Sequence, residues 1–406
     1  MTRTLIVGAS VGGVRTAQAL RGGGYDGEIV LIDLETEAPY DKPPLSKALL
    51  TGSAVPDGIR LLTPEQAGAA RIDLLLGLRA VGLDPRARVV AFDDGSSLGY
   101  DRLVVATGGS ARRPPWATTD GVHLVRTLAD AAGLRRDLAA GGPLVVIGAG
   151  FVGAEVASTG RRLGLDVTMI DAQPYPLSRS LSPDLARAVL ALHENAGVRC
   201  LMGAGVSGVA GSRGRLTVTL DDGTELKAAT LVAGIGAAPS DGWLATSGLT
   251  LDDGLVCDEH CRAVGTTDVY AVGDVARWFD LARGRHVRVE HWTNAVEQAA
   301  YVAHAIIDPR SPRPYRPVDF VWSDQHHWKI QVIGDATGPA ATAILGDPMA
   351  DQRFAALYAD EHGRLRGAVV VNWPRALVRC RKAMRETAAW RDLTADLHTA
   401  VGRAGA

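Results

Sequence analysis

Two segments of the sequence repeat the same order of features: a short apolar run, a glycine-rich turn, a helical stretch and a second apolar run that ends in aspartate. The first segment contains IVGASVGG and ends at Asp33, which lies 25 residues after Gly8. The second contains IGAGFVGAE and ends at Asp171, 23 residues after Gly148. The change from strand period to helix period across a glycine turn predicts two βαβ units.

The glycine turns suit the binding of a pyrophosphate group. Gly148-x-Gly150-x-x-Gly153 matches the pattern in which amides at a helix N-terminus approach phosphate and a downstream acid accepts hydrogen bonds from ribose. In the first turn Ser10 replaces the middle glycine, but a small side chain still lets the backbone approach. Because each turn follows a strand, opens a helix and has its acid, we expect two dinucleotide sites. The alternative is that one unit is a degenerate structural copy.

Two further strand ends suit a ligand that lies across the tips of the strands. Residues 103–108 (LVVATG) predict a strand that runs into a small-residue turn, and residues 268–274 (DVYAVGD) predict a strand that ends at Gly273-Asp274. A carboxylate in this position can accept a hydrogen bond from a sugar-like hydroxyl. Either segment alone would suit a simple turn, but together with the first glycine turn they favour ligand binding.

The totals place the chain among ordinary globular proteins. Its 406 residues favour two or three domains, and its net charge of −2 argues against a whole-protein binder of nucleic acid or membranes. The longest uncharged stretch, residues 138–154, contains turn glycines and a proline, so it predicts strand and loop rather than a membrane span. The N-terminus enters a strand at once and does not resemble a signal peptide, so we expect a cytoplasmic protein.

Several phrases of the sequence occur together in one known group of proteins. They are PYDKPPLSK (39–47), GAGFVGAEVA (148–157), GIGAAPS (234–240), AVGDVA (271–276), EHWTNAVEQA (290–299) and VWSDQHHWKIQ (321–331). With these phrases the chain resembles the FAD-dependent pyridine nucleotide-disulfide oxidoreductase superfamily. Within it, the chain is similar to the NADH-dependent ferredoxin reductases of bacterial oxygenase and haem monooxygenase systems. The resemblance covers residues 1 to about 335, and the remainder more loosely.

The resemblance implies an α/β fold of the glutathione reductase-like type, with two Rossmann-like dinucleotide-binding domains and a C-terminal α+β domain. It implies a discontinuous FAD-binding domain at residues 1–111 and 238–318 and an NAD-binding domain at 112–237. A C-terminal domain at 319–406 would cover the flavin. The first glycine turn is then expected to hold FAD, and the second to hold NAD(H).

The resemblance also assigns roles to residues around the two cofactors. Asp33 is expected to hold the adenosine ribose of FAD and Asp274 its ribityl chain. Asp171 would accept the ribose hydroxyls of the nicotinamide dinucleotide and repel a 2′-phosphate, so we expect NADH rather than NADPH, although Arg179 could meet a phosphate. The predicted cofactor-binding residues are Gly8, Ser10, Gly13, Asp33, Lys47, Thr107, Gly108, Gly148, Gly150, Gly153, Asp171, Arg179, Gly236, Gly273, Asp274, Trp292, Glu297 and Trp322.

Three residues are expected to act in the chemistry. In the family, the lysine at the position of Lys47 lies near the flavin ring, where a cation stabilises the reduced flavin. The glutamate matching Glu155 approaches the nicotinamide, and the aromatic matching Trp322 lies by the flavin. The alternatives are a solvated surface lysine, an exposed first-turn glutamate and a core tryptophan.

The cysteines indicate where the electrons go. Disulfide reductases and peroxide-reducing relatives use cysteines early in the chain, but here no cysteine precedes Cys200. Cys257 and Cys261 are interpreted as two small semi-buried residues. The flavin is therefore expected to pass single electrons directly to a [2Fe–2S]-type ferredoxin that serves an oxygenase.

Other interpretations remain open at this point. One is a flavin NADH oxidase or an apoptosis-inducing-factor-like NADH sensor that has no ferredoxin partner, and another is a non-catalytic flavoprotein module. His326 and His327 would face opposite sides of a strand, so no metal site is expected. The sequence does not distinguish a monomer from a homodimer.

Overall fold

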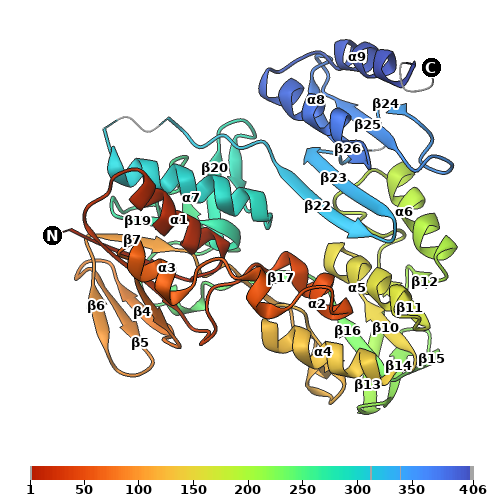
Figure 1. Ribbon diagram of the computed structural model, residues 1–406, viewed down its shortest axis with the longest axis horizontal. Helices are drawn as coiled ribbons and strands as arrows, with labels where there is room; N and C mark the ends of the chain where they lie inside the picture. The colour runs from red at the N-terminus through yellow and green to blue at the C-terminus, as the bar shows by residue number, and fades with distance from the viewer. Residues whose placement is uncertain (1, 311–312, 339, 403–406) are drawn as a thin grey trace. The chain divides into compact units, whose positions relative to one another are not determined.

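The computed structural model describes residues 2–310, 313–338 and 340–402. The chain forms two compact units, and each is discontinuous in the sequence (Figure 1). The first unit comprises Met1–Lys42, Val55–Ser110 and Ala237–Pro317. The second comprises Pro43–Ala54, Ala111–Gly236 and Val318–Ala406.

A parallel sheet with the strand order β19-β7-β1-β2-β3 lies at the centre of the first unit. The inner strands are buried apolar runs, as expected where a parallel sheet is covered on both faces. Val7 pairs with Ile32 on one side and Val105 on the other, so three carboxyl ends meet at one edge of the sheet. The strands are β1 (Arg3–Val7), β2 (Glu28–Asp33), β3 (Asp73–Leu76), β7 (Arg102–Val105) and β19 (Val269–Ala271).

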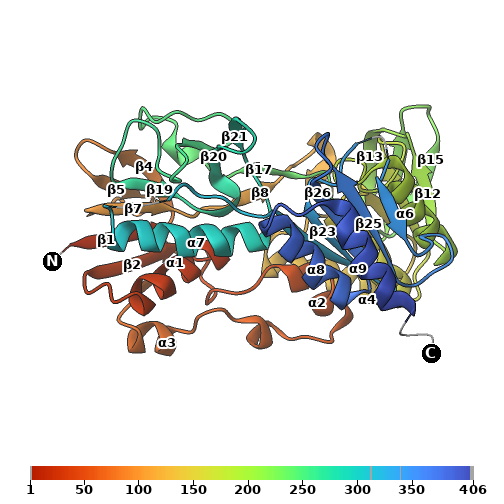
Figure 2. The same cartoon turned by 90° about the horizontal axis from the view of Figure 1, so that it is seen from above.

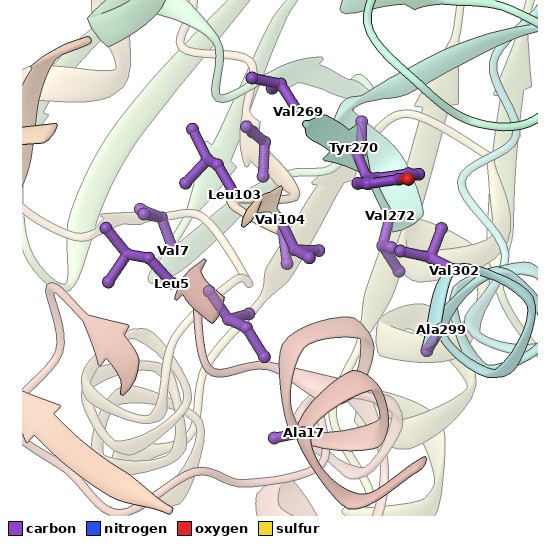
Figure 3. Packing of buried hydrophobic residues seen from close by; sticks show 14 of the residues in the cluster. Leu5, Val7, Ala17, Leu103, Val104, Val269, Tyr270, Val272, Ala299 and Val302 are labelled. Carbon is purple, nitrogen blue, oxygen red and sulfur yellow. The ribbon is translucent and has the colours of Figure 1, made fainter. Parts of the chain in front are cut away.

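Two helices of the first unit pack closely on each other beside this sheet. Figure 2 shows α1 (Val11–Gly22) and α7 (Trp292–Ile307) running side by side. Small residues allow the close approach: Ala17 of α1 and Ala299 of α7 are fully buried in the same cluster as strand residues such as Val104 (Figure 3). This packing fixes the N-terminus of α1 against the edge where the strands end.

The remaining elements of the first unit are short. Antiparallel strands form the sheets β4-β5-β6 and β18-β20-β21. The elements are α3 (Pro64–Ala69), β4 (Ala80–Asp84), β5 (Val89–Phe92), β6 (Ser97–Gly99), β17 (Ala237–Pro239), β18 (Leu255–Cys257), β20 (Ala276–Asp280), β21 (Arg285–Val287) and the 3-10 turns at Pro56–Ile59, Gly242–Leu244 and Gly273–Val275. Strand β8 (Gly109–Ala111) pairs with β17.

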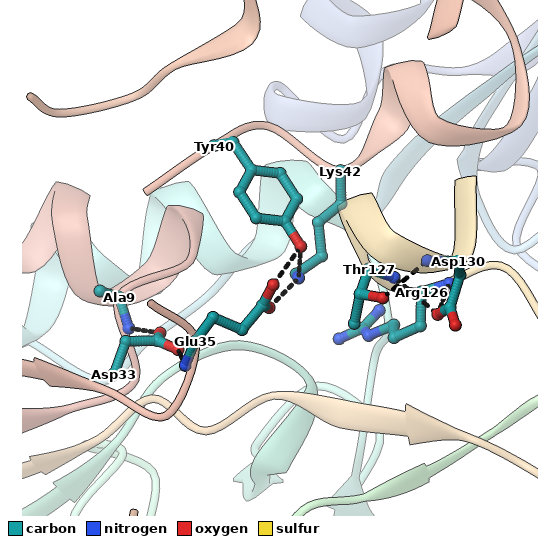
Figure 4. Close-up of polar contacts among 8 residues, drawn as sticks. All are labelled: Ala9, Asp33, Glu35, Tyr40, Lys42, Arg126, Thr127 and Asp130. Atoms are coloured by element: carbon teal, nitrogen blue, oxygen red, sulfur yellow. Dashed lines mark hydrogen bonds and ion pairs between the residues drawn. The ribbon is translucent and has the colours of Figure 1, made fainter. Parts of the chain in front are cut away.

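The second unit contains a parallel sheet with the equivalent order β12-β11-β10-β16-β9. Its helix α4 (Leu128–Ala140) begins with a capping box, because Thr127 accepts the amide of Asp130 and Asp130 accepts the amide of Thr127 (Figure 4). The other elements are the 3-10 turns Pro43–Ser46 and Pro115–Thr118, α2 (Ala48–Thr51), α5 (Phe151–Arg162), α6 (Pro183–Asn195), β9 (Val122–His123), β10 (Leu144–Ile147), β11 (Val167–Asp171), β12 (Arg199–Met202), β13 (Val206–Ser212), β14 (Arg215–Leu220), β15 (Glu225–Ala228) and β16 (Thr230–Ala233).

An antiparallel sheet, β22-β23-β26-β25-β24, completes the second unit. Alternate residues of β25 enter different cores, since Phe354 packs with residues of α6 while Ala355 packs with residues of α8 and α9. The sheet is therefore covered on both faces. The elements are β22 (Phe320–Gln325), β23 (Trp328–Gly334), β24 (Ala343–Leu345), β25 (Phe354–Ala359), β26 (Leu365–Val371), α8 (Pro374–Arg385) and α9 (Trp390–Gly402).

Candidate active site

The first glycine turn connects β1 to α1 and leaves no room for side chains at two positions. Gly8 has a φ of 107°, and a Cβ on it would lie 2.3 Å from the carbonyl oxygen of Ala106. A Cβ on Gly13 would lie 1.8 Å from the carbonyl oxygen of Gly8. Glycine is required at both positions, because the backbone folds against itself and against the end of β7.

The acid at the end of β2 holds this turn in place. The Asp33 carboxylate accepts the amide of Ala9 at 2.5 Å and the amide of Glu35 at 2.9 Å (Figure 4). Burial raises the pKa of Asp33 above its ordinary value, and the two amides oppose that shift. Since each carboxylate oxygen has two acceptor sites, Asp33 can hold the turn and still receive a ribose hydroxyl.

The second glycine turn connects β10 to α5 in the same way. Gly148 has a φ of 100°, and its Cβ would lie 2.3 Å from the carbonyl oxygen of Gly234. A Cβ on Gly153 would lie 1.9 Å from the carbonyl oxygen of Gly148. Asp171 accepts the amide of Ala149 at 2.6 Å. Each unit therefore presents a tight turn at a helix N-terminus.

These turns fit two dinucleotides. The first amides of α1 and α5 have no acceptor within their own helix, and the helix dipole favours an anion at that end. The residue that caps each helix is small and has an extended backbone: Ser10 in the first turn and Gly150 in the second. A Cβ at Gly150 would meet nothing within 4 Å, which explains why the first turn tolerates serine at the equivalent position.

The Gly273-Asp274 turn lies beside the first glycine turn. Gly273 has a φ of 77°, and its amide donates to the side chain of Gln298, which is fully buried. A Cβ on Gly12 would lie 3.1 Å from Val272, so the strand end and the start of α1 are in contact. Asp274 is thereby fixed close to the first turn. The sequence did not identify Gln298, although it lies within the phrase EHWTNAVEQA.

Thr107 and Gly108 also lie against the first turn. The Thr107 amide would be 2.9 Å from a Cβ on Gly8, and the Thr107 hydroxyl donates to the carbonyl of Ser240 at 2.8 Å. Gly108 has a φ of 66°, which favours glycine. The structure therefore gathers the ends of β1, β2, β7 and β19 at one site within the first unit.

The start of α7 belongs to the same unit. The indole Nε1 of Trp292 donates to Asp41 at 2.7 Å, which joins α7 to the segment that follows β2. Glu297, one turn further along α7, is partly buried. Both residues lie on the helix that supplies Gln298.

A cluster that the sequence did not identify follows Asp33 (Figure 4). Tyr40 donates to the Glu35 carboxylate at 2.6 Å, and the Lys42 ammonium lies 3.3 Å from the other oxygen of that carboxylate. The ammonium also lies 4.7 Å from the centre of the Tyr40 ring. These residues brace the segment between β2 and the Pro43-Pro44 turn. Tyr40 and Lys42 lie within the phrase PYDKPPLSK, which was the sequence signal that could have identified this cluster.

Lys47 and Glu155 form a buried ion pair in the second unit. The Lys47 ammonium lies 2.8 Å from Glu155 Oε1, and Glu155 is only 5 % exposed. Ser46 donates to Oε2 at 2.5 Å, and Ser323 donates to Oε1 at 2.7 Å. Glu155 is therefore buried rather than exposed at the first turn of its helix, and Lys47 is partly buried and paired with it. Ser46 and Ser323 were not identified from the sequence.

The other predicted residues of the second unit lie at separate places. Asp171 also accepts the amide of Gln173 at 2.7 Å, and Arg179 is exposed. Gly236 has a φ of 104°, and its carbonyl accepts the amide of Arg112. Trp322, on β22, is partly buried and stacks on Phe320 with ring centres 6.2 Å apart.

His326 and His327 lie in a turn, whereas the sequence predicted that they lie in a strand. His326 and His327 form the turn between β22 and β23 rather than continuing a strand, and His326 has a φ of 52°. Histidine is among the residues that adopt this left-handed conformation more readily than most. Strand alternation therefore does not apply to this pair. Across the described ranges, no group of three or more His, Cys, Asp or Glu side chains is arranged to hold a metal ion.

The four cysteines are free thiols. Cys257 and Cys261 are fully buried, more deeply than expected, and burial raises the pKa of both thiols. A thiol with a raised pKa is a poor nucleophile. In the part of the chain that the structure describes, every helix is too short or too polar to span a bilayer.

Comparison with known proteins agrees with the two-turn geometry. Residues 2–299 match the family described as pyridine nucleotide-disulphide oxidoreductase, and residues 320–401 match the reductase C-terminal family. The chain belongs to the pyridine nucleotide-disulphide oxidoreductase family. It therefore shares the family's cofactors, FAD and NAD(H), and its oxidoreductase chemistry.

Individual members of the family resemble the chain over most of its length. The ferredoxin reductase component of chlorobenzene dioxygenase from Cupriavidus sp. (strain PS12) is 37% identical over 376 residues, covering 92% of this chain and 90% of the relative. Putidaredoxin reductase from Pseudomonas putida is 36% identical over 364 residues, covering 87% and 85%. The covalent putidaredoxin reductase–putidaredoxin complex matches with a TM-score of 0.89 at 33% identity, over 95% of this chain and 93% of that one.

Proposed function

We propose that the chain is an NADH-dependent ferredoxin reductase that supplies electrons to an oxygenase or a haem monooxygenase. The observation that carries the proposal is the presence of two complete glycine turns, each with its acid, on a chain whose four cysteines are free thiols with a pKa raised by burial. Two dinucleotides can then be held, and no thiol is available to accept electrons from the flavin.

The relatives support the same acceptor. Their names identify them as ferredoxin reductase components, and one structural relative was solved in a covalent complex with putidaredoxin. We infer that the acceptor here is a small [2Fe–2S]-type ferredoxin. We place the protein in the cytoplasm, since its four free cysteines suit a reducing compartment.

We assign FAD to the first turn and NADH to the second. The FAD-binding domain is proposed to comprise residues 1–111 and 238–318, the NAD-binding domain 112–237 and the C-terminal domain 319–406. Bound FAD would supply the chemistry, accepting a hydride from NADH and releasing electrons one at a time. In the FAD site the turn glycines approach the pyrophosphate, while Asp33 and Asp274 receive hydroxyl groups.

Lys47 and Glu155 are proposed to act on the bound cofactors. Lys47 places a positive charge in an enclosed site, where it would stabilise negative charge more strongly than in water. Glu155, held by Lys47 and two serines, has a single fixed orientation and would position the nicotinamide. Trp322 is proposed to support the flavin by packing.

The test is reduction of cytochrome c by the purified flavoprotein and NADH, with and without added [2Fe–2S] ferredoxin. A large ferredoxin-dependent increase is expected. If NADH bleaches the flavin but several ferredoxins give no increase, the chain is an NADH oxidase or an NADH sensor. If NADH does not bleach the flavin at all, the chain is a non-catalytic flavoprotein.

A further inference from the structure

A row of polar side chains runs through the interior of the second unit. It begins on α5, crosses β22 to α6, and ends at the turn between β22 and β23. Glu155, Ser323, Gln325 and His193 are buried, and the last three have at most a trace of exposed surface. His326 is partly buried at the outer end of the row. Such a row is costly unless each member is hydrogen-bonded, and here each one is.

The contacts join these side chains one to the next. Glu155 Oε1 is 2.7 Å from Ser323 Oγ, and Ser323 Oγ is 3.0 Å from Gln325 Nε2. Gln325 Oε1 is 3.0 Å from His193 Nε2. His193 Nδ1 is 3.0 Å from His326 Nε2.

The direction of every bond in the row follows from the carboxylate. An ionised Glu155 can only accept, so Ser323 gives it the one hydrogen that its hydroxyl carries. Ser323 must then accept from the amide nitrogen of Gln325, which turns the amide oxygen toward His193. The facing nitrogen of His193 must carry a hydrogen.

The same reasoning fixes the tautomers of both histidines. A neutral imidazole carries one hydrogen, so His193 bears it on Nε2 and leaves Nδ1 as an acceptor. His326 must therefore carry a hydrogen on Nε2 to fill that acceptor. A second hydrogen on His193 would make Nδ1 a donor and would force His326 to move its own hydrogen to Nδ1.

The surroundings keep both rings neutral. Burial lowers the pKa of His193 to about 4. Burial also lowers the pKa of His326 to about 4, and the neighbouring His193, His327 and Arg161 oppose a positive charge there. An ordinary histidine has a pKa of about 6.5. Hence both rings stay neutral in the folded protein at pH 7.

The outer end of the row is anchored to the same helix as the inner end. The amide of His326 donates to the hydroxyl of Ser158 on α5 at 2.6 Å, one turn after Glu155. His326 has the left-handed backbone conformation that directs the turn toward this helix. The turn and the carboxylate are thus held at two neighbouring points of α5.

We propose that His193 and His326 are positioning residues, which act through Gln325 and Ser323 to hold Glu155 in the one orientation that also pairs with Lys47. The row transmits orientation and not protons, because a glutamine amide does not pass a proton along in its ordinary form. The proposal rests on the proposed function only in taking Glu155 to act on NADH. The histidine tautomers do not depend on that function.

The first test reads the tautomers directly in the intact flavoprotein. Long-range 1H–15N spectra of histidine-labelled protein at pH 7 are expected to show two neutral rings with hydrogen on Nε2, assigned by their loss in His193→Gln and His326→Gln. Both should titrate with a midpoint near pH 4 instead of 6.5. A charged ring at pH 7, or hydrogen on Nδ1 of His193, would overturn the proposal.

The second test measures the rate of flavin reduction by NADH in single-turnover mixing. His326→Phe removes the donor and is expected to slow reduction on the order of tenfold, with the Kd for NADH changed less than about twofold. His326→Gln offers an amide donor in its place and should recover part of the rate. His327→Phe, the exposed neighbour in the same turn, is the matched control.

The outcomes separate this proposal from the proposed function. If the tautomers are as expected but His326→Phe and His327→Phe reduce equally fast, the positioning role is wrong and the reductase function stands. If NADH does not reduce even the unaltered flavoprotein, the proposed function fails. The tautomer spectra still decide whether the row is built as inferred.

Discussion

The two glycine turns, one in each unit, have the same construction although only part of their sequence is shared. Gly8 and Gly148 have φ values of 107° and 100°, and a Cβ on either would lie 2.3 Å from a carbonyl oxygen at the end of a neighbouring strand. Asp33 and Asp171 each hold the amide that follows that glycine. The shared glycines and acids are the residues that the backbone geometry requires.

The likeness continues to the far end of the two helices. Arg21 and Arg161 occupy equivalent positions, 140 residues apart. Each arginine donates to the carbonyl of the residue four positions later, at 2.6 Å in both cases. Each also donates through Nε to the carbonyl of the residue that follows a later helix, Ala70 after α3 and Ala196 after α6. The repeated unit is therefore the whole turn, helix and return, not the glycine motif alone.

The units differ at the second residue after the last glycine. In the first unit this is Arg15, which is partly exposed and bonds to Gln18 on its own helix. In the second it is Glu155, which is buried and paired with Lys47. The backbone of the turn is proposed to bind a dinucleotide in either case. What differs is the chemistry placed beside it, because at this helix position the second unit has a buried carboxylate and the first has an arginine.

The largest expected effect comes from filling the turns. Gly8→Ala and Gly148→Ala should each lower the free energy of unfolding by about 2 to 4 kcal/mol, because the Cβ meets a carbonyl oxygen and φ is left-handed. If the turns bind different cofactors, Gly8→Ala should purify without FAD. Gly148→Ala should keep its flavin but lose reduction by NADH. Flavin absorbance and anaerobic NADH titration measure both.

Matched controls lie at the other ends of the same helices. Gly24 and Gly164 also have left-handed φ values, 84° and 79°, but a Cβ on either would meet nothing within 4 Å. Alanine at either position should lower the free energy of unfolding by about 1 to 2 kcal/mol, which is the backbone strain alone. Both cofactors should be retained. Loss of flavin in Gly148→Ala would show that the two turns are not independent sites.

The two βαβ units could be predicted, because the residues that specify each one lie close together in the sequence. The turn between Gly148 and Gly153 specifies its strand, its helix and its acid within one βαβ unit. The setting of Glu155 was not predictable, since Ser46 and Ser323 lie 109 and 168 residues away. The turn at His326 was also missed, because strand alternation gives no sign of where a hairpin reverses.

The second prediction tests the difference between the helices. Glu155→Gln should slow flavin reduction by NADH on the order of ten- to a hundredfold, because an amide cannot accept from Lys47 and both serines at once. Arg15→Gln, at the equivalent place in the first unit, should change the rate less than about twofold. Stopped-flow mixing with NADH measures the rate of flavin reduction in both variants. Equal effects would mean that Glu155 has no special role.

The third prediction concerns Asp33 and Asp171, each of which accepts the backbone amide that follows the first glycine of its turn. Asp171→Asn removes the charge proposed to repel a 2′-phosphate, so the ratio of kcat/KM for NADPH to that for NADH should rise about tenfold. Asp33→Asn should leave that ratio unaltered and weaken FAD retention instead. A rise in NADPH use in Asp33→Asn, or none in Asp171→Asn, would contradict the assignment of cofactors to turns.

The smallest expected effect comes from exchanging Ser10 and Gly150, which occupy the same position in the two turns. Ser10 makes no side-chain capping bond, and the space beyond Gly150 is open. Ser10→Gly and Gly150→Ser should each change the free energy of unfolding by no more than about 0.5 kcal/mol, and affinity for the cofactor by no more than about threefold. Thermal unfolding and cofactor titration measure these changes. A much larger loss in Gly150→Ser alone would show that NADH approaches the backbone more closely than FAD does, and the two turns would then differ in the ligand contact as well as in the neighbouring helix.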